Sequence, residues 1–378
     1  MTLSHGKPME NPVALILVFV ATLLAACEPT SQSSGGFAGL GEELATAEQG
    51  DYQQPSAGDT IRLPEDLGAH PAHRIEWWYL TANLTTASGE PLGLQWTQFR
   101  QALEPRPPHQ VPPPASDWPL EAVWMAHAAV SLGGDHRFAE RLARADIGHA
   151  GAEAEPFQVW LDHWQLRQTE AGPWRLRVGA GDWSYDLTLT PRREPVRHGV
   201  EGFSAKSASG EGSMYFSYVD LAIEGEVVLS GQQHEVSGTG WFDREWSSQF
   251  LKSGQQGWDW LALHLDSGAK LMAFRLRETH AGSDGGFRAG TWVPVAGEPV
   301  SLRQQDIQLH PTAWRSTDRG EVPSEWQVRV PGQGVELTVS ARPGDYWNIG
   351  LFPYWESPVT VTGSHTGVGY LELTGYGE

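Results

Sequence analysis

Short runs of alternating apolar and polar residues extend from Ile61 to the C-terminus, separated by turn residues. A period of two places successive side chains on opposite faces of a β-strand. Residues 140–145 favour a short helix, and residues 100–118 contain six prolines and are expected to form a loop. The clearest alternating runs are residues 183–190, 307–310, 326–330 and 335–339. The pattern therefore predicts an all-β protein.

Two of these runs share one pattern. Residues 76–84 are matched by residues 257–265, and each run then meets a Ser-Gly turn. Each returns through an apolar strand that ends in Phe-Arg, at residues 99–100 and at 274–275. In both hairpins one face is aliphatic, and the other carries rings and polar groups. The repeat predicts a tandem duplication with a ligand cavity near the junction of the two copies. Two unrelated amphipathic hairpins, or a sandwich core with rings at its edge, are the alternatives.

Composition and charge exclude several classes of function. The chain has 378 residues with 43 Gly, 26 Pro and 18 Trp, which disfavours long helices and leaves room for two domains. The formal net charge is −20. This acidity argues against a nucleic-acid partner, because such partners need a basic surface. His70 and His73 form the only close His pair, and no nucleotide-binding glycine loop occurs, so neither a metal nor a cofactor is expected.

The N-terminus has the pattern of a bacterial lipoprotein signal, with an ordinary secretory peptide as the alternative. An apolar run over residues 13–26 is too short to span a bilayer and ends in Leu-Ala-Ala before Cys27. Cys27 is the only cysteine, and we expect it to carry the lipid. Residues 1–26 are then the signal peptide, and residues 27–55 form a flexible tether. Glu28 favours the outer membrane, so the protein is expected in the cell envelope, lipid-anchored and facing the periplasm.

The densest polar and aromatic segment is residues 241–248, Trp-Phe-Asp-Arg-Glu-Trp-Ser-Ser. A carboxylate walled by indole rings loses hydration, so its pKa rises and it can donate a proton near neutral pH. Asp243 is therefore the leading candidate for a catalytic acid. The alternative is a buried ion pair between Asp243 and an arginine such as Arg244.

Other residues could complete such a site. Glu76 and Tyr215 are catalytic candidates that would orient water or substrate or relay a proton. The serine in residues 202–206 lacks the glycine pattern of a hydrolase nucleophile, so a hydrolase is the least favoured function. His127 lies in an apolar run, where a core histidine is the alternative. The ligand-binding candidates are Trp77, Tyr79, His127, Tyr218, Trp241, Trp258, Trp260 and Glu356.

Several of these segments resemble the AttH-like family of secreted, lipocalin-like proteins, which is related to carotenoid 1,2-hydratase. The resemblance implies two lipocalin-like, calycin-type antiparallel β-barrels: an N-terminal domain of the hydratase type at residues 56–240, and a C-terminal domain at 241–378. It also implies an ABC-type exporter as a partner. The segments that carry it are residues 73–79, 241–248, 257–260, 354–356 and 369–376.

In the hydratases an Asp in the matching segment protonates an isoprenoid double bond, and that position is Asp243 here. Trp241 replaces the tyrosine of the hydratases, which argues against a carotenoid as the substrate. We therefore expect an apolar or amphipathic ligand and acid–base chemistry, of hydratase or isomerase type, on an unsaturated lipid or isoprenoid. The alternatives are a non-catalytic lipid carrier or exporter accessory protein, and then a secreted hydrolase.

Overall fold

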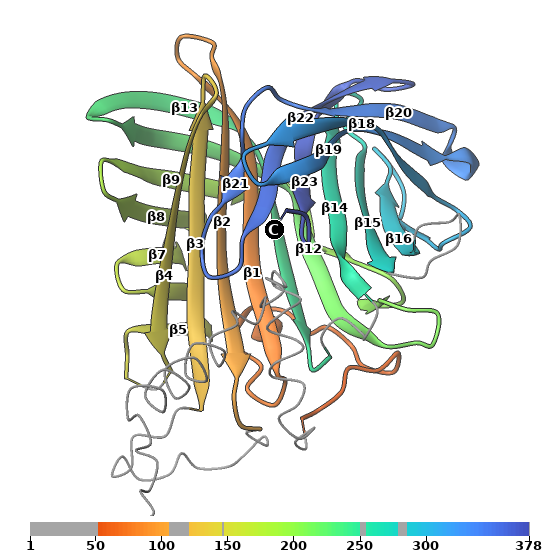
Figure 1. Ribbon diagram of the computed structural model, residues 1–378. Helices are drawn as coiled ribbons and strands as arrows, with labels where there is room; N and C mark the ends of the chain where they lie inside the picture. The colour runs from red at the N-terminus through yellow and green to blue at the C-terminus, as the bar shows by residue number, and fades with distance from the viewer. Residues whose placement is uncertain (1–51, 106–120, 146, 250–254, 279–285, 378) are drawn as a thin grey trace, which may run out of the picture. The chain divides into compact units, whose positions relative to one another are not determined.

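The computed structural model describes residues 52–105, 121–145, 147–249, 255–278 and 286–377. Cys27 and the expected signal peptide lie outside this part. The described chain consists of antiparallel strands in two sheets (Figure 1). Its helical elements are two short 3-10 turns, η1 (Glu65–Leu67) and η2 (Pro331–Gln333). The predicted all-β class with two barrel-like sheets is confirmed.

The first sheet has thirteen strands in the order β4-β3-β2-β1-β13-β12-β9-β8-β7-β6-β5, and β10 and β11 pair with β12. Strands near its two ends, β4 and β6, contact each other, so the sheet nearly closes into a barrel. Its strands are β1 (Ile75–Thr86), β2 (Pro91–Ala102), β3 (Ala122–Leu132), β4 (Asp135–Arg144), β5 (Ala150–Ala154), β6 (Phe157–Leu161), β7 (Trp164–Gln168), β8 (Trp174–Ala180), β9 (Trp183–Pro191), β10 (Val196–Arg197), β11 (Phe203–Ala205), β12 (Gly212–Leu229) and β13 (Gln232–Ser247).

The second sheet has ten strands in the order β17-β16-β15-β14-β23-β22-β20-β19-β18, and β21 pairs with β22. It curves into a half-barrel. Its strands are β14 (Gln255–Leu265), β15 (Lys270–Glu278), β16 (Phe287–Val293), β17 (Val300–Leu302), β18 (Gln308–Thr317), β19 (Gly320–Val330), β20 (Val335–Ala341), β21 (Trp347–Asn348), β22 (Tyr354–Gly363) and β23 (Gly367–Leu373).

The strand order repeats between the two sheets, as the duplication predicts. In the first sheet β1 lies between its hairpin partner β2 and the last strand, β13. In the second, β14 lies between its hairpin partner β15 and the last strand, β23. The two expected hairpins are therefore separate and occupy equivalent places. The expected domain division at 240/241 falls inside β13, which stays paired with β1 up to Ser247.

The two faces of each hairpin meet different environments. The ring-bearing faces meet in a third cluster between the sheets, which includes Tyr79 from β1 and Trp260 and Ala262 from β14. They thus point away from the two barrel interiors, which apolar side chains fill. The aliphatic faces join the core of their own sheet through Trp78, Leu80, Ala82 and Leu84 in the first and Leu261, Leu263 and Leu265 in the second.

The sheets approach each other closely where β2 passes β22 and β23. A Cβ atom at Gly93 would lie 2.7 Å from Tyr370 Oη and 2.8 Å from Pro358 Cγ, so a side chain is excluded there. Nearby, Asn83 Nδ2 donates a hydrogen bond to the Gly369 carbonyl at 3.1 Å. These contacts hold the first hairpin against the last hairpin of the second sheet.

The four clearest alternating runs lie in or beside strands, with β9, β18, β19 and β20 at the expected places. The expected helix at 140–145 is wrong, because residues 140–144 belong to β4. That strand pairs with β3 along its whole length, and this tertiary pairing overrides the local helix propensity. The expectation that the loop begins at residue 100 is also wrong, because residues 100–102 form the end of β2. Within the described residues, no helix combines the length and apolar character needed to cross a membrane.

Candidate active site

A cavity of about 170 Å³ lies where the ring-bearing faces of the two hairpins meet. We call it the junction cavity. The surface of its walls is mostly apolar, from rings and aliphatic groups, and carboxyl, hydroxyl and amide groups and Lys206 lie among them. Among its lining residues are Trp77, Tyr79, Tyr215, Asp243 and Glu245 from the first sheet and Trp258, Trp260, Phe274, Tyr354 and Glu372 from the second. Such an apolar pocket with few polar groups is typical of a small-molecule site.

Asp243 lies in the wall of the junction cavity on β13 and is 2% exposed. Its Oδ2 accepts a hydrogen bond from Tyr215 Oη at 2.8 Å. Its Oδ1 accepts bonds from Trp241 Nε1 at 2.6 Å and from the Ser217 hydroxyl. All three donors are neutral, and in the described part of the chain no arginine or lysine forms an ion pair with Asp243.

Burial without a cation raises the pKa of the Asp243 carboxyl to about 7, although the hydrogen bonds from Ser217, Tyr215 and Trp241 lower it. Arg244, the expected alternative partner, points to the opposite face of β13, as its place beside Asp243 in a strand requires. Asp243 thus faces a cavity and holds a proton that it can exchange near neutral pH.

Behind Asp243, a hydrogen-bond chain leads to the second sheet. Because Ser217 donates its only hydrogen to Asp243, its oxygen accepts from His198 Nε2 at 2.6 Å. His198 Nδ1 then accepts from Thr291 Oγ1 at 2.8 Å. Burial, with the charge of Lys206, lowers the pKa of His198 to about 3, so the ring stays neutral. These hydrogen bonds hold the Asp243 carboxyl in position but do not provide a positive charge.

Tyr215 connects Asp243 to the cavity. Its hydroxyl oxygen accepts from Trp260 Nε1 at 3.2 Å and lies against Asp243 Oδ2. When Asp243 is protonated on Oδ2, that proton is donated to the Tyr215 oxygen, which leaves the Tyr215 hydrogen free to point into the cavity. Burial raises the pKa of Tyr215 well above its usual value, so the hydroxyl is neutral.

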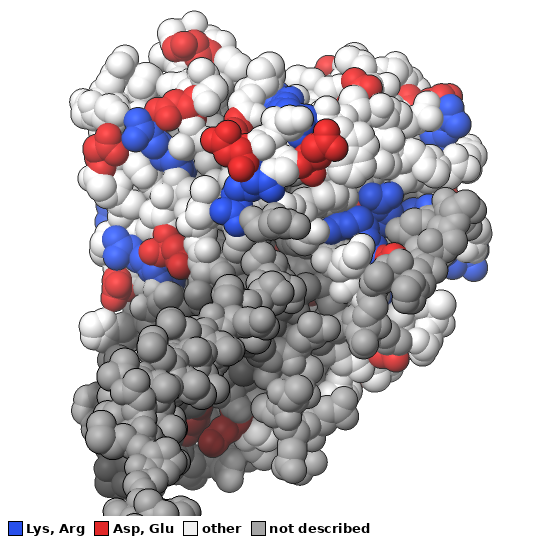
Figure 2. Space-filling model, viewed as in Figure 1, with Lys and Arg blue, Asp and Glu red and all other residues white. Residues whose placement is uncertain are grey.

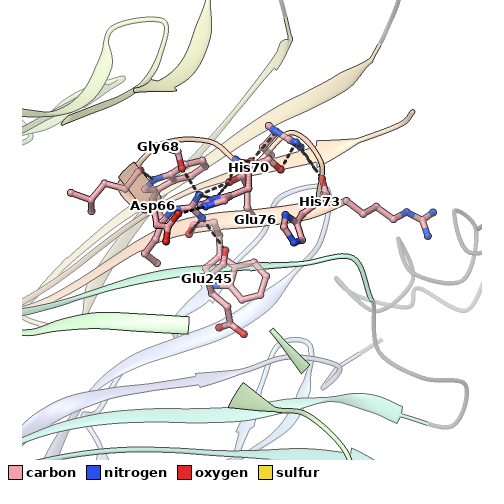
Figure 3. Close-up of polar contacts among 12 residues, drawn as sticks. Asp66, Gly68, His70, His73, Glu76 and Glu245 are labelled. Atoms are coloured by element: carbon pink, nitrogen blue, oxygen red, sulfur yellow. Dashed lines mark hydrogen bonds and ion pairs between the residues drawn. The ribbon is translucent and has the colours of Figure 1, made fainter. Parts of the chain in front are cut away.

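Glu76 lies outside the junction cavity, in a buried polar network. Its carboxylate pairs with Arg100 at 2.9 Å and with Arg244, which also stacks on the Trp78 ring at 3.9 Å. Burial raises the pKa of Glu76, but Arg100 and Arg244 together lower it further, so that it lies well below its usual value. Figure 3 shows this network with His70 and Asp66, and Glu245 pointing away from it. Glu76 therefore occupies a structural ion pair and has no contact with the cavity.

The carboxylate of Glu245 lies on the cavity side of β13, two residues after Asp243. It accepts from the Ser213 hydroxyl and pairs with Lys206 Nζ at 2.9 Å. The Lys206 ammonium lies 4.2 Å from the Phe274 ring centre and 5.0 Å from that of Tyr215. This compensated pair places two opposite charges in the cavity wall.

The second sheet contributes two carboxyl groups. Glu356 is 1% exposed and accepts from Tyr79 Oη at 2.5 Å and from Asn348 Nδ2 at 3.3 Å. Glu372 lines the cavity and accepts from Trp258 Nε1 at 2.7 Å. Burial raises the pKa of Glu372 to about 7, and burial with the charge of Glu372 raises the pKa of Glu356 well above its usual value.

The remaining ligand-binding candidates do not line the cavity. Trp241 lies directly behind Asp243 and is fully buried. His127 lies behind the cavity residue Tyr354, with Nδ1 3.2 Å from its hydroxyl and Nε2 2.9 Å from Glu140 Oε2. Tyr218 packs into the core of the first sheet, with its ring centre 4.8 Å from that of Trp174.

Sequence reasoning missed five residues of the site. Glu245 stood in the segment that we singled out, and Ser217 stood two residues from Tyr215. Lys206 and Glu372 stood in the segments 202–206 and 369–376 without a role, and His198 has no unusual neighbours in sequence. Only the fold brings these three residues to Asp243 or to the cavity. In the described residues, no group of three or more His, Cys, Asp or Glu is placed to hold a metal ion.

The acidic side chains at the surface differ from those of the cavity. On the face in Figure 2, the Asp and Glu side chains of the described residues are interspersed with Lys and Arg. Asp243, Glu356 and Glu372 instead have neutral hydrogen-bond donors around them. Their burial, and not the overall acidity of the chain, therefore distinguishes them.

Comparisons with known proteins identify the family and proteins of similar fold. The sequence model of the AttH-like family matches residues 54–376. A crystal structure from Nitrosomonas europaea assigned to AttH is 31% identical, with a TM-score of 0.74 over 84% of this chain and 98% of that one. Kievitone hydratase from Nectria haematococca is 14% identical, with a TM-score of 0.60 over 86% of this chain and 98% of that one. That second likeness concerns the fold alone. No curated protein matches the chain.

Proposed function

Because the chain belongs to the AttH-like family, we propose that it performs acid–base chemistry on a carbon–carbon double bond of an apolar or amphipathic molecule in the junction cavity. The observation that carries this proposal is a buried, uncompensated carboxyl group, Asp243, in the wall of an apolar cavity. The kievitone hydratase, which has the same fold, supports a reaction of hydratase type.

The proton transfer follows from the hydrogen bonds. Asp243 Oδ2–H donates to Tyr215 Oη as the Tyr215 hydroxyl gives its hydrogen to one alkene carbon. A C–H bond forms from the π electrons, the other alkene carbon becomes a cation, and Asp243 becomes a carboxylate. Water then adds to the cation and loses a proton, which gives an alcohol. Loss of a proton from a neighbouring carbon gives an isomerised alkene instead.

The cavity walls suit such a cation. The rings of Trp77, Tyr79 and Trp260 line it, and aromatic faces attract a positive charge, by ~2 kcal/mol or more in a desolvated site. The same walls restrict water, which would otherwise quench the cation at random. The ion pair of Glu245 and Lys206 can orient a polar end of the ligand.

The experiment uses the full chain in D₂O with three probes: a prenylated phenol, a linear isoprenoid alcohol and an unsaturated fatty acid. Mass spectrometry measures deuterium bound to carbon and the mass gain of added water. We expect Asp243→Asn to abolish deuterium incorporation and Tyr215→Phe to reduce it by about 10²–10⁴-fold. Tyr218→Phe is the matched control, because it removes a hydroxyl from the same strand outside the cavity, and it should retain activity.

The second candidate function is a carrier that holds the same class of ligand without turnover, as an accessory of an ABC-type exporter. The observation that favours it is the mostly apolar wall of the cavity. A stoichiometric lipid in an organic extract of the purified protein, with no deuterium incorporation into any probe, would favour the carrier and overturn the enzyme.

We further propose that the mature protein begins at Cys27, which carries the lipid, and that it faces the periplasm from the outer membrane. The support for this is the Leu-Ala-Ala-Cys sequence after a short apolar run. A lipid anchor would keep the cavity close to its apolar ligands in the bilayer. Fractionation of envelope membranes, with palmitate labelling of the protein, tests this placement.

A further inference from the structure

The junction cavity is built from equivalent positions of the two duplicated modules. In the first sheet Tyr79 on β1 lies opposite Asp243 on β13. The sequence repeat matches Tyr79 with Trp260, and in the second sheet Trp260 on β14 lies opposite Glu372 on β23. Glu372 is therefore the counterpart of Asp243 in the second module, and both residues line the cavity.

The equivalence extends to the next strand. Ser217 lies beside Asp243 on β12, and Glu356 lies beside Glu372 on β22. Asp243 and Glu372 each accept from an indole, but from different positions: Trp241, on the same strand as Asp243, donates at 2.6 Å, and Trp258, on the neighbouring strand β14, donates to Glu372 at 2.7 Å.

The hairpin rings also cross between the modules. Trp260, from the second sheet, donates to Tyr215 Oη at 3.2 Å, beside Asp243. Tyr79, from the first sheet, donates to Glu356 at 2.5 Å, and Glu356 lies beside Glu372. Each module thus contributes one ring to the polar group of the other.

The two halves differ at one position that matters. The serine beside Asp243 is replaced by Glu356 beside Glu372, so two carboxyl groups are cross-strand neighbours, about 4.5–5.5 Å apart at their Cβ atoms. In the described residues their hydrogen-bond partners are the neutral Tyr79, Asn348 and Trp258. Burial without a cation opposes the ionisation of both carboxyl groups, so the pair retains at least one proton near neutral pH.

We propose that Glu372, sharing a proton with Glu356, is a second catalytic group of the cavity and takes the proton from the water that adds to the substrate cation. Glu372 is the cavity-facing member, whereas Glu356 is a positioning residue behind it. As the water oxygen bonds to carbon, one water hydrogen passes to the carboxylate of the pair. Asp243 has lost one proton to the substrate and the pair has gained one, so exchange with solvent restores both. This inference rests on the proposed function.

The first test needs no substrate. Infrared spectroscopy at about pH 6 detects the C=O stretch of protonated carboxylic acids, which ionised carboxylates lack. We expect two components in the wild-type protein. Asp243→Asn should remove one, and Glu372→Gln or Glu356→Gln should each remove or shift the other. Asp186→Asn is the control, because Asp186 is a carboxylate paired with Arg175 and Arg177 that does not line the cavity, and it should leave both components in place. A spectrum unchanged in Glu372→Gln overturns the shared proton.

The second test separates the two groups by product, with the three alkene probes in D₂O. We expect Glu372→Gln to keep deuterium incorporation within about threefold of wild type and to lower water addition by about 10²-fold or more. Glu356→Gln should give a smaller loss of the same kind. The catalytic role of Glu372 is overturned if Glu372→Gln lowers deuterium incorporation and water addition equally, or lowers neither. If the wild-type protein incorporates no deuterium, the proposed reaction is overturned. The infrared spectrum alone then tests the shared proton.

Discussion

Replacement of Asp243 by Asn tests the site through stability, without a substrate. The folded protein raises the pKa of Asp243 to about 7, against 3.8 for an ordinary Asp. Between these values the folded state holds a proton that the unfolded chain has released. The stability that this proton represents is complete below the unfolded pKa and is lost as the pH rises through the folded pKa.

The magnitude follows from the shift. The two pKa values differ by about three units, and each unit corresponds to about 1.4 kcal/mol. The wild-type free energy of unfolding should therefore lose about 4 kcal/mol from this group between about pH 4 and pH 8. Asn at this position keeps the shape, and its amide can donate to Tyr215 as the protonated acid does. The variant should match the wild type near pH 4 and become more stable by up to about 4 kcal/mol near pH 8.

Urea unfolding followed by tryptophan fluorescence measures this difference across the pH range. Asp186→Asn is the control with the opposite sign. Its hydrogen bonds with Arg175 and Arg177 hold the pKa of Asp186 below its usual value, so its stabilisation is lost only on acidification. A loss of about 3–5 kcal/mol in Asp243→Asn at every pH, as for a broken buried ion pair, would refute the cavity acid.

Three further outcomes are expected. Arg244→Met leaves the buried carboxylate of Glu76 without one of its cations, and it should lower the free energy of unfolding by about 3–5 kcal/mol in urea; a neutral effect would remove the structural role of this pair. Gly93→Ala places a methyl group against Tyr370, and it should cost about 1–3 kcal/mol by the same measurement, whereas an unchanged midpoint would mean that the sheets yield there. Cys27→Ser should release the protein from membranes during fractionation, and retention of a processed Ser variant would contradict the lipid anchor.

The sequence by itself determined the strands, their faces and the duplication. The period of two is a local property, so Tyr79 and Leu80 had to lie on opposite sides of β1 wherever that strand is placed. The repeat around Trp260 likewise required a second hairpin. Local propensity misplaced residues 140–144, where pairing with β3 decides the conformation, and residues 100–102, which pair with β3 as the end of β2.

The tertiary structure decided which carboxyl groups have a raised pKa and which are held ionised by a cation. Asp243, Glu76 and Glu356 look alike in sequence, since each lies within two residues of a tryptophan. The fold gives Asp243 neutral donors in a cavity wall, gives Glu76 two arginines, and places Glu356 beside another carboxyl group. The pKa of a buried acid depends on the charges within a few ångströms, and strand register brings those charges from distant parts of the chain. This is why the sequence identified Asp243 as a candidate, while only the structure revealed Glu372 on the opposite wall.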